Sequence, residues 1–495
     1  MSNIVKEWSS FQKLIFNTYL EFPKHNLSIS ATAGSGKSTV LLELLKLKDT
    51  TKTCVFLTFS KALAEELKEK VPDGVLASTI HSLCLKSLFK HYSGCLKIDD
   101  GKAMKIAMKL GKSKFTDILP AQLGKYCFQL LQHVQSYRLN CCENMDQYEK
   151  INVMNGRELC ASEKEHTLLI VDAIREYNKK KPSKTNKLLI DFTDMLEMMV
   201  TNNTIYPTRY DEVYIDEFQD LSALQMQVVD KITKRSGRQI MCGDEKQSLY
   251  MFIGADIARY KEIQNRPNTK ILTLPITYRC SKAICKEASK IYDDIVPRDG
   301  APEGAVYYDG SPFDAVSGDF VICRNNKPLI DLYFEMLTEG KKCFIRDKDL
   351  GKKLTKAVKS FGNIPIGLAM SKIDTGLDKV RAELKKRGIK RPSLHPRYIT
   401  ASELAEILKN ILMRFETLAD VQKLLTRMFV EDKKNPGVML TTFHKSKGLE
   451  CDNVYLYRLK STFPSKYATT PQMMEQENNA LFVGTTRGRL TLTYC

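Results

Sequence analysis

Short apolar runs bounded by polar residues recur through the first half of the chain and predict the strands of a sheet. They lie at residues 27–29, 54–57, 75–83, 213–215 and 239–242. Runs of this length are typical of strands, whereas longer periodic stretches are typical of helices. Between the third and fourth runs, residues 86–187 follow a helical pattern that is poor in strands. We therefore expect a helical subdomain inserted into the first sheet-bearing domain.

A second region of strands and helices starts near residue 271. Its expected strands are residues 271–274, 320–323, 438–442, 454–457 and 490–494. The intervening stretch is helical and basic, and Pro436-Gly437 marks its exit. The expected division of an α/β chain is then as follows: residues 1–85 and 188–270 for the first domain, 86–187 for its helical insertion, 271–360 and 435–495 for the second domain, and 361–434 for a small basic helical insertion.

The composition indicates a globular protein with a polyanionic partner. The 495 residues suffice for several domains, and an apolar share of 43% excludes a disordered chain. Lys and Arg exceed Asp and Glu by 76 − 58 = 18. A basic surface suits a polyanion, although charge alone also fits a generically basic protein. Lysines cluster at residues 341–359 and 379–391, which favours patches over a uniform spread.

The cysteine and histidine spacings exclude the common metal centres. None of the 14 cysteines forms a CxxC pair, and the 7 histidines show no metal-ligand spacing. The cysteines fit reduced thiols. Residues 1–24 lack an apolar signal core, and no apolar run is long enough to span a bilayer. We expect an intracellular, soluble protein of the cytoplasm or nucleoid with no membrane partner.

The most informative motif is a phosphate-binding loop of the Walker A kind between a predicted strand and a predicted helix. Glycines let the backbone amides surround a β-phosphate, and the following helix points its positive end at it. Lys37 reaches the β- and γ-phosphates, and Ser38 offers a hydroxyl to Mg²⁺. A plain turn before a helix is the alternative, which the strand–loop–helix order disfavours. The expected ATP contacts are Ala31 (where glycine is usual), Thr32, Ala33, Gly34, Ser35, Gly36, Lys37, Ser38 and Thr39.

An acidic pair supplies the second half of a nucleotide site. Asp216 and Glu217 follow the apolar run 213–215. Asp216 is placed to hold Mg²⁺ through water, and Glu217 to orient and deprotonate the attacking water. The same pair also fits an ordinary helix N-terminus, but the Walker A loop favours the nucleotide site. Lys37 and Asp216 are 216 − 37 = 179 residues apart and must meet at one nucleotide, which supports an insertion between them.

A loop at residues 243–256 and two distant arginines complete the set. Gln247 can contact the γ-phosphate and its water, while Tyr250 and Phe252 offer ring faces to nucleobases. Arg279 and Arg487 come from the second α/β region, which suits a sensor of the γ-phosphate. Each arginine alone also fits an ordinary surface or sheet-edge residue.

The ordered motifs resemble superfamily 1 helicases of the UvrD/Rep/PcrA type. The matching segments are residues 31–38, 58–61, 78–82, 191–194, 216–220, 243–256, 277–279, 442–450 and 483–487. The resemblance implies an α/β fold with two RecA-like P-loop domains, parallel sheets and helical inserted subdomains. It also implies an ATP hydrolase that uses ATP and Mg²⁺, translocates 3′→5′ on single-stranded DNA and unwinds tailed duplex DNA in replication or repair. Protein partners stay unknown.

The resemblance also assigns residue roles. Gln12 is similar to the glutamine that reads adenine, and Gly448 and Glu450 to the ribose and phosphate side of the second domain. Arg279 and Arg487 resemble the two arginine fingers, while Gln247 links the γ-phosphate to DNA. For Phe59 and Phe192, core packing is an equal alternative to base contact, whereas stacking is favoured for Tyr250 and Phe252. The implied single-strand contacts are Phe59, His81, Phe192, Tyr250, Phe252, Thr442 and His444.

Several positions depart from the family pattern. Ile253 stands where the family has arginine, and residues 476–479 read Gln-Glu-Asn-Asn in place of Glu-Glu-Arg-Arg. The 442 − 279 = 163 residues from Arg279 to Thr442 imply a reduced second insertion, and the end at Cys495 predicts no partner-binding tail. Two alternatives therefore stay open: a single-strand translocase or nucleoprotein remodeller with weak unwinding, or activity on RNA.

Overall fold

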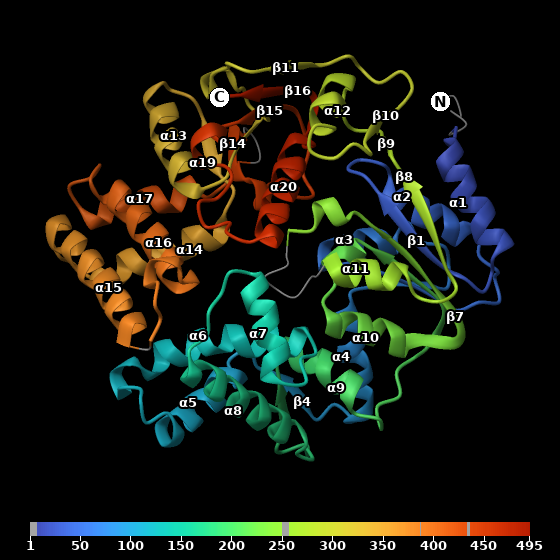
Figure 1. The fold of residues 1–495 in the computed structure, drawn as a ribbon, viewed down its shortest axis with the longest axis horizontal. Coiled ribbons are helices and arrows are strands. Elements are labelled where there is room, and N and C mark those ends of the chain that lie inside the picture. The colour runs from blue at the N-terminus through green and yellow to red at the C-terminus, as the bar shows by residue number, and fades with distance from the viewer. Residues whose placement is uncertain (1–6, 250–256, 387, 433–435) are drawn as a thin grey trace. The chain divides into compact units, whose positions relative to one another are not determined.

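The computed structural model describes residues 7–249, 257–386, 388–432 and 436–495 (Figure 1). The chain forms two compact units. The first contains Met1–Ile151 and Ala161–Pro275, and the second contains Asn152–Cys160 and Ile276–Cys495. Among the described residues, no helix has the length and apolar character needed to cross a membrane.

A six-stranded parallel sheet forms the centre of the first unit. Its order is β3-β2-β6-β7-β1-β8. Because all strands run parallel, the residues that follow their carboxyl ends gather at one edge of the sheet. The strands are β1 Asn26–Ala31, β2 Cys54–Leu57, β3 Val75–Ser78, β6 Tyr210–Asp216, β7 Thr233–Gly243 and β8 Thr269–Leu274.

Helices cover both faces of this sheet, because alternate strand residues point to opposite sides. Phe56 and Tyr214 pack in one core with helices α1 Ser10–Glu21 and α2 Lys37–Lys46. Val55 and Ile215 pack in a second core on the other face. That core includes residues from α4 Ile80–His91, α9 Phe192–Thr201, α10 Ala223–Ile232 and α11 Ile257–Gln264. Helix α3, Lys61–Lys68, follows β2.

The stretch expected to be a helical insertion contains mainly helices. They are α5 Lys102–Lys114, α6 Pro120–Leu139, α7 Met145–Met154 and α8 Ala161–Asn178. The pattern missed the short parallel pair of β4 Leu96–Ile98 and β5 Leu188–Ile190, which joins the two ends of this stretch.

Two sequence expectations for the first sheet are wrong in detail. The third run does not continue as strand to residue 83, because Thr79 caps a helix that begins at Ile80. The strand near residue 271 was assigned to the second domain, yet β8 pairs with β1 along its whole length. Pairing with a partner more than two hundred residues away leaves no local signature in the sequence.

A second six-stranded parallel sheet forms the centre of the other unit, in the order β11-β16-β15-β12-β14-β13. Its strands are β11 Ala305–Tyr307, β12 Phe320–Cys323, β13 Cys343–Ile345, β14 Val438–Thr442, β15 Cys451–Leu456 and β16 Gly488–Tyr494. A separate pair joins β9 Ile276–Thr277 to β10 Val296–Pro297. This unit also contains helices α12 Lys282–Ala288, α13 Asn326–Thr338, α18 Phe443–Ser446, α19 Leu459–Thr462 and α20 Pro471–Thr485.

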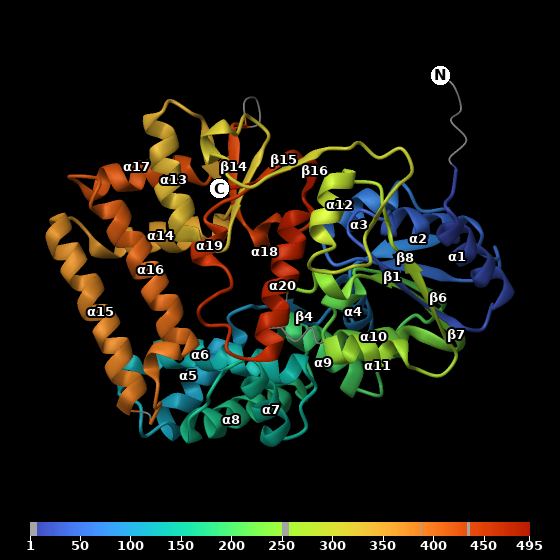
Figure 2. The same ribbon diagram turned by 45° about the horizontal axis from the view of Figure 1, so that its top comes forward.

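Four helices occupy most of the space between β13 and β14 in the chain. They are α14 Lys348–Phe361, α15 Ile366–Lys386, α16 Pro396–Leu412 and α17 Leu418–Met428. Helix α15 lies along α16, and α14 along α17 (Figure 2). Ile373, Leu408 and Val421 share one buried core with Met336 and Leu440. The expected basic insertion thus begins earlier than residue 361, and most of its buried side chains belong to the core of the second sheet. Val380, Leu384 and Ile389 form a small separate cluster. Two parallel α/β sheets with added helices confirm the predicted fold class.

Candidate nucleotide and nucleic-acid sites

The loop between β1 and α2 has the backbone shape that phosphate binding requires. Gly34 and Gly36 adopt φ values of 71° and 81°, in the left-handed region that glycine enters without strain. Gly36 is the N-cap of α2, so the first turn of this helix starts at Lys37 and Ser38. A Cβ at Gly36 would lie 4.0 Å from Nε2 of Gln12, which brings the predicted adenine reader beside the loop.

The loop meets the acidic pair at the carboxyl edge of the sheet. The Ser38 hydroxyl donates to the Asp216 carboxylate at the end of β6. The Lys37 ammonium lies 3.6 Å from Glu217 Oε1. These residues are 178 to 180 positions apart in the chain, and parallel strands β1 and β6 bring them together, as the motif spacing requires.

The electrostatics of this cluster suit a cation and a phosphate. Burial, followed by the charge of Glu217, raises the pKa of Asp216. Burial disfavours charged Lys37, yet the carboxylates of Glu217, Asp244 and Asp216 outweigh it and raise the pKa of Lys37. A hydroxyl and a nearly buried carboxylate are oxygen ligands of the kind Mg²⁺ prefers. Ser38 and Asp216 therefore fit the metal of a bound Mg²⁺–nucleotide.

Glu217 has a backbone conformation that is uncommon for its residue type. Its φ is 55°, in the left-handed region. Strain of this sort persists where the surrounding structure enforces it and often marks functional sites. The following residues Phe218–Asp220 form a short 3₁₀ helix, and Gln219 reaches back to donate to the Glu217 carboxylate.

A chain of hydrogen bonds runs from Gln247 to Glu217. The Gln247 amide donates to Asp244 Oδ2, and the Asp244 backbone N–H donates at 2.9 Å to Oε1 of Gln219. Gln219 in turn donates to Glu217. The sequence had picked out the two ends but missed Gln219 and Asp244. Both lie inside motif segments that match the family, close in sequence to Glu217 and Gln247. This proximity is the feature of the sequence from which their role could have been predicted.

The candidate single-strand contacts of the first unit follow its strands β2, β3 and β5. Phe59 is 52% exposed and Phe192 is 51% exposed. His81 packs edge-on against Phe192, with ring centroids 5.8 Å apart, and burial lowers the pKa of His81. Two phenylalanines this exposed are not core residues, so the core-packing alternative loses its support.

A buried ion-pair network lies behind Phe192. Arg138 donates to Asp194 at 2.7 Å and to Glu197 at 2.8 Å, and Lys102 pairs with Asp194 at 2.5 Å. Arg138 and Lys102 are 2% and 1% exposed. The network ties helices α5 and α6 to α9, whose first residue is Phe192. No local sequence pattern predicts this network, since its members lie up to 95 residues apart.

In the second unit, the predicted nucleotide contacts pair with one another. Arg279 Nε donates to Glu450 Oε2 at 2.7 Å, and Arg279 Nη1 donates to the Thr486 carbonyl at 3.3 Å. Gly448 precedes this glutamate by two residues with φ 82°. Arg487 is 1% exposed. Its guanidinium donates to the carbonyls of Val483 and Leu449 and to the Thr486 hydroxyl.

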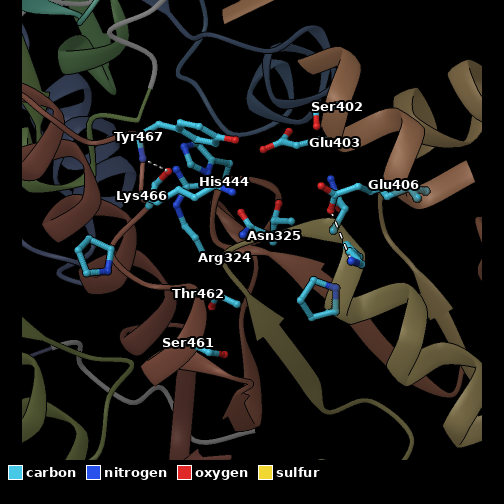
Figure 3. Close-up of a pocket in the computed structure, with 17 residues that line it drawn as sticks. Arg324, Asn325, Ser402, Glu403, Glu406, His444, Ser461, Thr462, Lys466 and Tyr467 are labelled. Atoms are coloured by element: carbon cyan, nitrogen blue, oxygen red, sulfur yellow. Dashed lines mark hydrogen bonds and ion pairs between the residues drawn. The ribbon is translucent and has the colours of Figure 1, made fainter. Parts of the chain in front are cut away.

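Thr442 and His444 line a polar cavity of about 420 Å³ in the second unit (Figure 3). Arg324 and His444 lie on one side, and Glu403 projects from α16 on the other. Burial, with the charge of Arg324 next, lowers the pKa of His444 to about 4, so its ring is neutral at pH 7. Glu477, from the departing segment 476–479, holds Arg324 by a bidentate pair with distances of 2.6 to 3.1 Å.

Three further sequence candidates lie outside the described residues. They are the two expected stacking residues Tyr250 and Phe252 and the neighbouring departure at Ile253. Their assignments stay predictions from the motif.

A phosphate-binding loop and an acidic pair at the carboxyl edge of a parallel sheet define the P-loop class of α/β proteins. Comparison with family models matches residues 15–268 to the UvrD/REP helicase N-terminal domain. This match covers about half of the chain, and the chain belongs to the UvrD/REP helicase family. The resemblance drawn from the motifs is thereby confirmed.

Individual relatives are distant and longer. The chain is 25% identical to F-box DNA helicase protein 1 of Schizosaccharomyces pombe, over 98% of this chain and 57% of that protein. It is 22% identical to ATP-dependent DNA helicase PcrA of Bacillus subtilis, over 54% of this chain and 37% of that protein. It is 24% identical to RecBCD enzyme subunit RecB of Buchnera aphidicola, over 61% of this chain and 29% of that protein. The chain thus spans between three tenths and three fifths of the length of these relatives.

Proposed function

We propose that this protein is an ATP-dependent DNA helicase that translocates 3′→5′ on single-stranded DNA and unwinds tailed duplex DNA. The observation that carries the proposal is the assembly of Lys37, Ser38, Asp216 and Glu217 at one sheet edge. Membership of the UvrD/REP helicase family supports DNA as the substrate and ATP hydrolysis as the source of energy. The polarity rests on resemblance alone.

The site residues divide the chemistry of ATP hydrolysis among them. Backbone amides of residues 31–38 and the Lys37 ammonium bind the phosphates. Ser38 and Asp216 hold Mg²⁺, which supplies positive charge to the phosphate oxygens. Glu217 orients a water and accepts its proton as that water attacks the γ-phosphorus, the bond from this phosphorus to the β–γ bridging oxygen breaks, and ADP leaves. Gln12 lies beside the loop and reads the adenine.

The hydrogen-bond chain from Gln247 to Glu217 supports coupling between strand and nucleotide. Gln247 lies three residues before Tyr250, which is expected to stack on a base. A displacement of this loop would reach the general base through Asp244 and Gln219. Phe59 and His81 follow strands β2 and β3 of the sheet, and Phe192 packs against His81, so these three residues extend the proposed strand path. Thr442 and His444 contribute from the second unit.

The second unit supplies arginines for the developing charge on the γ-phosphate. We assign this role to Arg279 and Arg487, with Gly448 and Glu450 on the ribose and phosphate side. Arg279 is the more accessible of the two arginines, whereas Arg487 is bound by backbone carbonyls. The helices of residues 86–187 and the helices α14 to α17 are proposed as the helical insertions of the two domains.

Strand displacement on matched substrates tests the proposal. ATPase and unwinding rates are measured with 3′-tailed DNA, 5′-tailed DNA and the equivalent RNA, with Glu217→Gln as the inactive control. Unwinding of the 3′-tailed DNA alone is the expected result. ATPase stimulation by single strands without displacement would instead favour the translocase or remodeller alternative, and equal rates on RNA would overturn the choice of DNA.

A further inference from the structure

A groove between α14 and α17 takes no part in the proposed motor. It has a volume of about 550 Å³ and belongs entirely to the second unit. Lys348, Lys352, Lys356 and Lys359 form one wall, and residues Leu425, Thr426, Phe429 and Val430 form the other. The floor is apolar, while one rim is strongly basic.

The basic rim is a regular row. The four lysines are spaced by four, four and three residues, so they share one face of α14. They span about 16 Å along the helix axis, at 1.5 Å per residue. Within the described part of the chain, no carboxylate lies within 4.0 Å of these four ammonium groups. The four ammonium groups are therefore available to form ion pairs with the carboxylates of an acidic partner.

The floor of the groove is apolar, and helices α14 and α17 pack closely beneath it. A Cβ at Gly351 would lie 2.8 Å from Cγ of Phe429, so only glycine lets this ring pack against the backbone of α14. Glycine inside a helix is less favourable than alanine, and the contact with the ring explains its presence. Leu425 and Phe429 are nearly buried, whereas Val430 beside them is 61% exposed.

We propose that this groove binds an acidic amphipathic helix of a partner protein. Apolar side chains at i, i+3, i+4 and i+7 of such a helix fill the floor, and carboxylates along its flank pair with the lysine row. The length of the row matches about three turns of helix. This site is independent of the nucleotide chemistry proposed above.

Nucleic acid is the other ligand that a lysine row attracts, and the floor argues against it. Phosphodiester groups gain nothing from an apolar surface, and base stacking needs an open aromatic face. Among the described residues that line this groove, Phe429 has the only aromatic ring, which is 6% exposed and packed on Gly351. Leucine or phenylalanine side chains fit such a surface, whereas a sugar–phosphate backbone does not.

The test uses a fluorescein-labelled peptide of about fifteen residues, four helical turns. Leucines form one stripe and glutamates flank it, and a scrambled peptide of the same composition is the control. Fluorescence anisotropy with the full chain gives both affinities. The expected result is clear preference for the amphipathic peptide, with about tenfold weaker binding in the Lys352→Glu/Lys356→Glu variant because two ion pairs become repulsive.

Two further variants make the result specific. Lys353→Glu changes an exposed lysine of the same helix that does not line the groove, so peptide binding is expected to stay at the parent value. Val430→Asp places a charge on the apolar side of the groove and is expected to weaken peptide binding about as much as the double variant does. Equal binding of the amphipathic and scrambled peptides overturns the proposal. A second outcome also overturns it: oligothymidylate displaces the peptide, and the double variant loses oligothymidylate binding to the same extent as peptide binding. That outcome would assign the lysine row to nucleic acid.

Discussion

Arg279 and Glu450 form an ion pair, with Arg279 Nε 2.7 Å from Glu450 Oε2. The sequence had assigned the arginine to the γ-phosphate and the glutamate to the ribose and phosphate side, from segments 171 residues apart. Their pairing supports a common position at the edge of the second sheet. Since the glutamate side chain is 45% exposed, water screens the pair and its contribution to stability is small. A phosphate could therefore compete for the arginine.

Replacing Arg279 with alanine is expected to lower DNA-stimulated ATP turnover by about a hundredfold or more, because its target is charge that develops in the transition state. The Kd for ATP changes far less. Arg414→Ala is the matched control, since Arg414 lies in the same unit, pairs with Asp331 at 3.3 Å and has no proposed role. Steady-state turnover and nucleotide titration on each variant separate the two effects. An equal loss of affinity and turnover would make Arg279 a ground-state ligand.

Glu217→Gln is expected to retain ATP and DNA binding but to lose about two decades or more of hydrolysis, the scale of a general base. Lys37→Ala is expected to weaken nucleotide binding itself, because it removes the ammonium beside the phosphates. The control is Glu262→Gln, an exposed position on α11. Single-turnover hydrolysis with labelled ATP measures the step directly. Hydrolysis at the parent rate in Glu217→Gln would contradict its assignment.

Local motifs made the nucleotide half-sites predictable, whereas contacts between distant segments were not. The Walker A loop and the Asp216–Glu217 pair are contiguous, and each needs only its own strand and turn. Gln219 approaches Asp244 only through the sheet, so its role has no signature of its own. The same holds for β8, whose membership of the first sheet depends on pairing with β1.

The boundary of the second insertion shows the same limit. Charge and helical periodicity located a basic helical stretch but could not reveal that Leu408, Ile411 and Val421 complete the core of the second sheet. Deleting residues 361–434 therefore removes core side chains and exposes their partners. Point variants are the sharper experiments on this region, because the deletion confounds loss of folding with loss of function.

Gly243→Ala is expected to lower ATP turnover without loss of nucleotide binding. The new Cβ would lie 2.4 Å from Gln219 Oε1 and 2.7 Å from Phe218 Cδ1, so Gln219 must leave its position between Asp244 and Glu217. Overpacking of this kind costs about 1–3 kcal/mol of stability. Gly124→Ala is the control, because its nearest neighbour lies at 4.0 Å. Kinetics and a melting curve on both variants test the expectation, and unchanged kcat in a destabilised Gly243→Ala would exclude a coupling role for Gln219.

Arg138→Met is expected to destabilise the first unit by about 3–5 kcal/mol, because it leaves the buried carboxylates of Asp194 and Glu197 short of a cation. Arg175→Met is a close control. Arg175 also pairs with Glu197, at 2.9 Å, but its side chain is 41% exposed, so the expected loss is about 1 kcal/mol or less. Chemical denaturation compares the two free energies of unfolding. Similar small losses would mean that the network is not a structural clamp for α9.

Phe192→Ala and Phe59→Ala are expected to weaken single-strand binding with little change in stability. Both rings are half exposed, so truncation leaves no cavity. Each stacked base contributes about 1–3 kcal/mol, which corresponds to roughly five- to hundredfold in Kd. Phe128→Ala is the control, since this phenylalanine is 61% exposed on α6 and outside every motif. Titration with oligothymidylate and a melting curve on the same samples distinguish the roles: a lowered melting temperature with intact binding would restore the core-packing interpretation.

Because His81 packs edge-on against Phe192, His81→Ala is expected to lose part of the same binding energy, and the double variant with Phe192→Ala to lose less than the sum of the two.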